Sequence, residues 1–199
     1  MSARIDIVNY ALSILGEKAI ESLEDNLPQA RVMKRFYYLA RDAELEGAEW
    51  TFATKRFLPA ASSTPPPWGW QYAFPIPSEI IRVIQVDRNW VTVSNFSASA
   101  LERDPVPHEV EGREILCDQD VIYCKGIRRI EDEGIYSPLF AEAFGARLAV
   151  LGALPLTESA KVQQLALTIY AGLIKDAKSR DGMQNSTRRI RNKSFSRVR

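Results

Sequence analysis

The chain is poor in the residues that build most catalytic and metal sites. It has one histidine and two cysteines in 199 residues, and Cys117 and Cys124 lack the paired spacing of a zinc site. It has no glycine-rich phosphate-binding loop and no serine or cysteine in a nucleophile motif. We therefore expect no metal, no cofactor and no enzymatic activity. Both cysteines are expected to be small buried residues in a reducing compartment.

Long hydrophobic runs are also missing. No apolar stretch approaches the roughly 18 residues that a membrane span needs. Charges at Arg4 and Asp6 come too early for a signal peptide. We expect a protein that is made and used without export and without a membrane partner. Its hydrophobic fraction of 46% is ordinary for a globular protein, and its length suits one domain or a domain with a sizeable insertion.

Charge is unevenly distributed along the chain. Residues 181–199 contain six cations and one acid, a net charge of +5, and because the whole chain carries +1 the first 180 residues carry −4. An acidic body with a basic tail favours an acidic partner for the tail. Too few apolar residues are present there to build a core, so we expect the tail to be disordered on its own.

The basic tail also contains apolar side chains among its cations, which favours docking on a protein over contact with DNA. The residues expected to dock are Arg188, Arg189, Ile190, Arg191, Lys193, Phe195, Arg197, Val198 and Arg199.

Helical periodicity is found towards both ends of the chain. Apolar residues at three- and four-residue steps predict a helix from about Ser2 to Gly16 and a longer one from Pro28 to Trp50, with Asn26 as its cap. The apolar stripe of the longer helix includes Phe36, and Leu45 lies off this stripe. The opposite face, which includes Arg41 and Glu44, mixes charges of both signs, so at least part of it is expected to contact water.

Two more helices are predicted near the end of the chain. Ser137 and Pro138 form a strong start signal for one helix, and Pro155 is expected to end it. A further helix is expected to begin at Thr157 and to fray near residues 180–182. Its predicted inward side chains are Val162, Leu165, Ala166, Ile169 and Leu173.

The intervening segment has the two-residue period of β-strands. Residues 80–86 are apolar on both faces, which predicts a central strand, and Gly112-Arg113 suits a two-residue hairpin turn. Aromatic residues occupy every second position at Trp68, Trp70, Tyr72 and Phe74. They could form a base- or sugar-stacking platform, but the core face of a sheet is the favoured interpretation.

Together these patterns predict an α+β fold, in which a four-helix bundle carries an inserted, mostly antiparallel β domain and an extended C-terminal tail. Residues 1–50 and 137–180 are assigned to the bundle, residues 51–136 to the β domain and residues 181–199 to the tail.

Two possible catalytic features have weak support. His108 stands alone, so a catalytic triad is not expected. Glu131, Asp132 and Glu133 could supply the carboxylate pair of a glycoside hydrolase, but three adjacent acids before a glycine favour a solvated turn.

Five segments, taken in order, resemble the tail tubular protein A family of bacteriophage head-to-tail adaptors. They are LGEKAIESLED, RFYYLARDAELEGAEWTFATKR, PPWGWQYAFPIP, HEVEGREIL and YSPLFAEAFGARLA. The similarity covers roughly residues 5–178 and does not extend into the basic tail.

This resemblance implies a structural protein of the virion, assembled in the host cytoplasm. Such a protein would form a twelve-subunit ring between the portal protein and the tail nozzle protein, and double-stranded DNA would pass through it without specific binding. By analogy, the basic tail would dock on the portal. Two other hypotheses stay open: a tail-associated polysaccharide hydrolase and a DNA-binding packaging factor.

Overall fold

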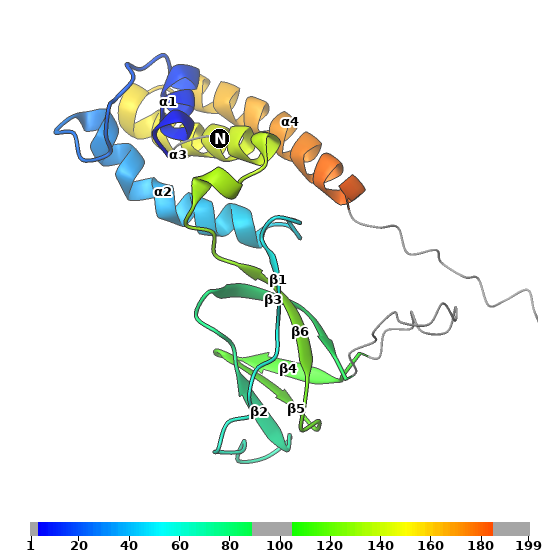
Figure 1. The fold of residues 1–199 in the computed structure, drawn as a ribbon. Helices are drawn as coiled ribbons and strands as arrows, with labels where there is room; N and C mark the ends of the chain where they lie inside the picture. The colour runs from blue at the N-terminus through cyan, green and yellow to red at the C-terminus, as the bar shows by residue number, and fades with distance from the viewer. Residues whose placement is uncertain (1–3, 89–104, 185–199) are drawn as a thin grey trace, which may run out of the picture.

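The computed structural model describes residues 4–88 and 105–184. Helices gather at one end of the molecule and strands at the other (Figure 1). The helices are α1 (Arg4–Leu15), α2 (Pro28–Glu46), α3 (Pro138–Thr157) and α4 (Ala160–Gln184), with a short 3-10 helix, η1 (Glu133–Ile135), before α3. The strands are β1 (Thr54–Phe57), β2 (Tyr72–Pro75), β3 (Ile80–Asp87), β4 (His108–Glu111), β5 (Glu114–Cys117) and β6 (Tyr123–Arg128).

Helix α3 is the centre of the helical part. It packs against α1, α2 and α4, which make few contacts with one another. Ten of its twenty residues are buried, and seven of those ten are alanine or glycine, which lets neighbours approach closely. A Cβ atom placed on Gly145 would lie 2.7 Å from the Tyr10 ring, and one on Gly152 would lie 2.8 Å from Met33 Cε. By length and composition alone α3 could also cross a membrane, but a buried core helix meets the same criterion.

This arrangement shows that the predicted four-helix bundle with an inserted β domain is wrong. In a bundle the helices surround a shared core, whereas α4 lies mainly along α3 and buries only Ala166, Ala177 and Asp181 among its 25 residues. The molecule is an α+β protein with four helices and two small antiparallel sheets. Helical periodicity predicted the helices, but it could not show that one of them would be enclosed by the other three.

The described strands form two three-stranded sheets with the orders β1-β6-β3 and β2-β5-β4. The predicted central strand, β3, is an edge strand of the first sheet, and β6 is central. Ile127 of β6 is fully buried in the same hydrophobic core as the helices. A second, smaller core contains Phe74, Ile115 and Cys124. The first sheet therefore shares its core with the helices, and the second sheet packs on the smaller core.

Several predicted element boundaries are confirmed. Ser137 Oγ accepts a hydrogen bond from Phe140 N and caps α3. Gly16 follows α1 with a φ of +74°. Gly112 has a φ of +56° in the hairpin between β4 and β5, a conformation that glycine adopts without a steric cost.

Other boundaries differ from the prediction. Helix α2 ends at Glu46, and Trp50 folds back into the core, where its Nε1 donates to Glu44 O at 2.8 Å. Asn26 accepts a hydrogen bond from Arg31 and does not cap α2, whose N-cap is Leu27. Helix α3 continues past Pro155 to Thr157, and this proline is exposed in its last turn.

Candidate functional site

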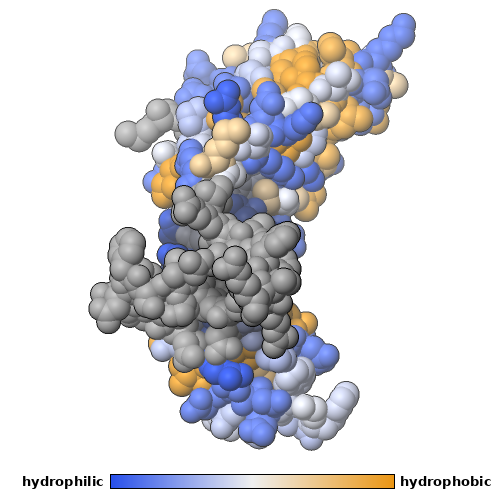
Figure 2. Space-filling model, turned by 90° about the vertical axis from the view of Figure 1, so that its right-hand side faces the viewer, coloured by the Kyte–Doolittle hydropathy of each residue, from blue (hydrophilic) through white to orange (hydrophobic). Residues whose placement is uncertain are grey.

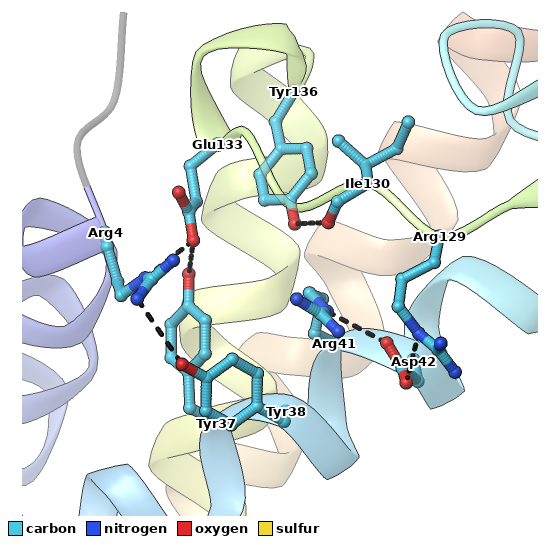
Figure 3. A network of polar contacts seen from close by, with 9 residues as sticks. All are labelled: Arg4, Tyr37, Tyr38, Arg41, Asp42, Arg129, Ile130, Glu133 and Tyr136. Atoms are coloured by element: carbon cyan, nitrogen blue, oxygen red, sulfur yellow. Dashed lines mark hydrogen bonds and ion pairs between the residues drawn. The ribbon is translucent and has the colours of Figure 1, made fainter. Parts of the chain in front are cut away.

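A polar network joins the helical part to the chain segment that leads from β6 to α3 (Figure 3). Glu133 of η1 is at its centre and is only 9% exposed. Its Oε1 atom accepts hydrogen bonds from Arg4 Nε at 2.8 Å and from the Tyr37 hydroxyl at 2.9 Å. These contacts hold α1, α2 and η1 together.

The network continues along α2 through Asp42. Its two carboxylate oxygens accept hydrogen bonds from Arg41 Nε at 2.9 Å and from Arg129 Nε at 3.0 Å. Nearby, the Tyr136 hydroxyl donates to Ile130 O at 3.1 Å. Because Arg129 directly follows β6, these bonds fix the end of the first sheet against α2.

A surface depression of about 340 Å³ lies over this network. Tyr38 forms part of its wall, with Arg41 Cζ 5.1 Å and Arg4 Cζ 5.8 Å from the centre of its ring, within the range of cation–π contacts. The residues lining the depression are Arg4, Tyr38, Arg41, Asp42, Arg129 and Glu131. Its cations are largely balanced by neighbouring carboxylates.

In this network the pKa values of Tyr37 and Arg4, which ordinarily lie above neutral pH, are raised further. Burial, assisted by the negative charge of Glu133, raises the pKa of Tyr37 far above its usual range. The hydrogen bond that Arg4 donates to the Glu133 carboxylate raises the pKa of Arg4. Both side chains therefore keep their protons at ordinary pH, which suits a structural joint better than a site of proton transfer.

A second network connects α2, α3 and α4. The buried Glu44 accepts hydrogen bonds at Oε1 from Arg147 Nη1 at 2.6 Å and from the Tyr170 hydroxyl at 2.5 Å. Burial favours a lower pKa for Arg147, but the hydrogen bond and charge of Glu44 outweigh it, so the pKa is raised. Burial and the same carboxylate raise the pKa of Tyr170.

The C-terminal end of α4 is fixed to the turn that precedes β1. The carboxylate of Asp181 accepts hydrogen bonds from Thr51 N at 2.9 Å and Thr51 Oγ1 at 2.7 Å, and Lys178 Nζ donates to Gly47 O at 3.1 Å. The prediction that the helix frays at residues 180–182 is therefore wrong, and α4 continues to Gln184.

The aromatic row predicted for one strand face is only partly in a strand. Phe74 is fully buried in the smaller core, and Trp70 and Tyr72 pack against it. Trp68 precedes β2 and is 83% exposed. Three of the four rings therefore agree with the core interpretation.

The three adjacent acids have separate surroundings. Asp132 Oδ1 accepts a hydrogen bond from Gly134 N at 2.8 Å, Glu131 lines the depression, and Glu133 is buried. The predicted solvated turn is therefore wrong for Glu133, because its carboxylate meets Arg4 and Tyr37 from distant parts of the chain.

The remaining candidate residues give no catalytic centre in the described ranges. His108 is exposed on β4 with Nδ1 2.7 Å from Val106 O. Both cysteines are buried, as expected, and burial raises the pKa of Cys124 to about 12. No cluster of three potential metal ligands is found in residues 4–88 and 105–184. The predicted docking residues 188–199 lie outside the described residues.

Sequence patterns did not identify the buried ion pairs as a site. Arg41 and Glu44 belong to the charged face that was expected to be at least partly in water, but both are buried, at 4% and 3% exposure. A signal was present, since both lie on the same helical face as Tyr37 at steps of three or four residues. A search for charges beside the apolar stripe would have found them.

Comparison with models of known protein families and with curated proteins finds no match to this chain. The family resemblance of the five segments therefore stays a prediction.

Proposed function

We propose that this protein is a structural head-to-tail adaptor of a tailed bacteriophage. It forms a twelve-subunit ring between the portal protein and the tail nozzle protein, and DNA passes through that ring. The proposal starts from the ordered resemblance of five segments to this family of adaptors. It assigns no catalytic role and no cofactor to the chain.

The observation that carries the proposal is the exposure of α4. This helix of 25 residues buries three of them, while Leu165 and Leu167 are 57% and 44% exposed. Leu165 was predicted to face inward and does not. Figure 2, viewed from the side on which α4 ends in Figure 1, shows hydrophobic atoms at the surface of the helical part. A long helix with exposed leucines is suited to packing against another chain.

A ring requires two different surfaces on each subunit, because neighbours in a closed ring of more than two copies meet head to tail. Besides α4, α2 has exposed apolar side chains: Leu39 is 67% exposed and Tyr38 is 48% exposed. We assign the α4 surface to one neighbour and the α2 surface to the other.

The pairing of several arginines with carboxylates also favours an adaptor over a DNA-binding packaging factor. Arg4, Arg41, Arg129 and Arg147 each form an ion pair with a carboxylate. Cations that are paired in this way attract phosphate weakly. If the cations of the channel wall are paired with carboxylates in this way, DNA can pass through the channel without being held.

Titration of isolated portal rings with the protein, followed by mass photometry, tests this proposal. We expect binding to saturate near twelve copies for each portal ring. The double variant Leu165→Glu, Leu167→Glu should fold normally but bind incompletely, because charges would be placed in the contact between copies. Leu58→Glu is the matched control, since Leu58 is 62% exposed and lies outside α4. Failure of the unaltered protein to bind portal would contradict the proposal.

A further inference from the structure

Strand β4 is an exposed edge strand at the end of the molecule away from the helices (Figure 1). All four of its residues are exposed, and Val110 is 50% exposed. Among the described strands it pairs only with β5. Its outer edge can therefore accept hydrogen bonds from an added strand.

Negative charge is concentrated on one face of this edge. Glu111 lies directly opposite Glu114 of β5, and Glu109 is two residues away along the same face. Like charges in directly opposed positions destabilise a strand pair. The nearby Arg113 does not relieve this, because its Nη2 atom donates to Ile76 O and to Pro77 O, at 3.3 and 2.6 Å.

This charge pattern selects against some partners and for others. Two β4 edges would repel each other through their glutamates, so pairing between identical edges is disfavoured. A strand with cations at alternate positions would instead place them opposite Glu109 and Glu111. An apolar residue between those cations would lie opposite Val110.

The basic tail of this chain has that pattern in its sequence. Arg197-Val198-Arg199 reverses the charges of Glu109-Val110-Glu111 and keeps the central valine. Both triplets read the same in either direction, so the complementarity holds for parallel and antiparallel pairing. The tail also carries Arg189-Ile190-Arg191, a second triplet of the same kind.

Reach favours the triplet at the end of the tail. Helix α4 ends at Gln184 and is fixed there through Asp181 and Thr51. Four residues separate Gln184 from Arg189, which allows about 14 Å when extended. Twelve residues separate Gln184 from Arg197, which allows about 40 Å when extended, nearly three times the span available to Arg189.

We propose that Arg197-Val198-Arg199 of one copy adds as a strand to the outer edge of β4 in a second copy. The contact deepens the proposed ring by linking neighbouring subunits. Between free copies a single triplet binds weakly, and a covalent cross-linker traps such a short-lived contact. In an assembly, tails held close to acceptor edges have a high effective concentration. Residues 197–199 bound to β4 cannot dock on the portal at the same time, so this proposal replaces the expected portal contact for those three residues.

Cross-linking between two singly substituted full-length proteins tests this contact. Val110→Cys protein is mixed with Val198→Cys protein and treated with a short bismaleimide, without portal. The native cysteines are buried and should not react. We expect a covalent dimer containing both variants at near-physiological salt, and several-fold less of it at 1 M salt. Ser13→Cys, at an exposed position on α1, replaces Val110→Cys as the control and should give little product.

Reversing the charges on each partner distinguishes a specific contact between the tail and β4 from cross-linking by random collision. Glu109→Lys with Glu111→Lys in the first protein should abolish the cross-link. Arg197→Glu with Arg199→Glu in the second protein should then restore it. The inference is overturned if the mixed dimer does not form or if it is indifferent to charge reversal. It is also overturned if a protein carrying both cysteines links only within one chain. Because portal is left out, these outcomes are independent of portal binding, which tests the proposed function separately.

Discussion

Helices α3 and α4 follow each other in the chain and pack side by side, yet they differ sharply in burial. Helix α3 buries ten of 20 residues, whereas α4 buries three of 25. Alanine and glycine make α3 thin enough for three helices to pack around it. Helix α4 covers one flank of α3 and leaves its leucines in solvent. The difference shows that α3 is the centre of the helical part, and it supports the proposal that α4 contacts another copy.

The largest expected difference between the two helices concerns large apolar side chains. Phe144 of α3 is fully buried, with its ring 5.2 Å from that of Tyr37. Phe144→Ala should lower the free energy of unfolding by about 3–5 kcal/mol. Leu165→Ala in α4 should change it by less than about 0.5 kcal/mol. Urea unfolding of both variants checks this. Similar losses of unfolding free energy in the two variants would contradict the difference between α3 and α4.

Glycine substitutions should have opposite signs in the two helices. A Cβ on Gly145 would lie 3.1 Å from Ile7 O, so Gly145→Ala should cost about 1–3 kcal/mol through overpacking. The matched site in α4 is Gly172, where a Cβ meets nothing within 4 Å. Gly172→Ala should stabilise the fold by about 0.5–1 kcal/mol, because alanine favours a helix. Thermal unfolding reports both, and a loss at Gly172 would mean that its surroundings are not open.

A smaller effect is expected at the polar contact that holds the end of α4. Asp181→Ala removes the carboxylate that accepts hydrogen bonds from Thr51 N and Thr51 Oγ1 and should cost about 1–2 kcal/mol. Asp176→Ala, at an exposed position of the same helix, is the control. Chemical denaturation distinguishes them. Equal effects at the two positions would show that the buried contact does not hold α4.

The smallest predicted effect is a pH dependence. The folded-state pKa of Tyr170 lies above its unfolded value, so its neutral form favours folding below about pH 10. This contribution is lost as the pH rises through the folded pKa. Tyr170→Phe should therefore make the decline in stability above pH 10 less steep. Unfolding midpoints between pH 9 and 11 test this, and an unchanged slope would mean that Tyr170 does not contribute.

Local signals along the chain predicted several elements correctly. Ser137 followed by Pro138, and glycine at positions 16 and 112, act through short-range backbone geometry, and the structure agrees at all three places. Such features need no knowledge of distant parts of the chain. They can therefore be predicted from sequence alone.

Burial was harder to predict because it depends on distant partners. Leu45 was placed off the buried stripe but is fully buried, whereas Leu165 was placed inward and is exposed. Phe36 was expected to lie in the core and is only partly buried. Glu133 became buried because Arg4 and Tyr37 approach it from about 100 or more residues away. Periodicity identifies the possible faces of a helix, but it does not show how many neighbours cover them.

Hydroxyl-radical footprinting of the free protein and of the portal-bound assembly most directly tests whether α4 is an interface. Leu165 and Leu167 lie on different flanks of α4, because residues two apart on a helix do not share a face. The account predicts that labelling of at least one of them falls several-fold on assembly, because a neighbouring copy covers it. Labelling of Phe144 should be low in both states, since it is already fully buried. Unchanged labelling of both leucines in assembled rings would contradict the assignment of α4 to the contact between copies.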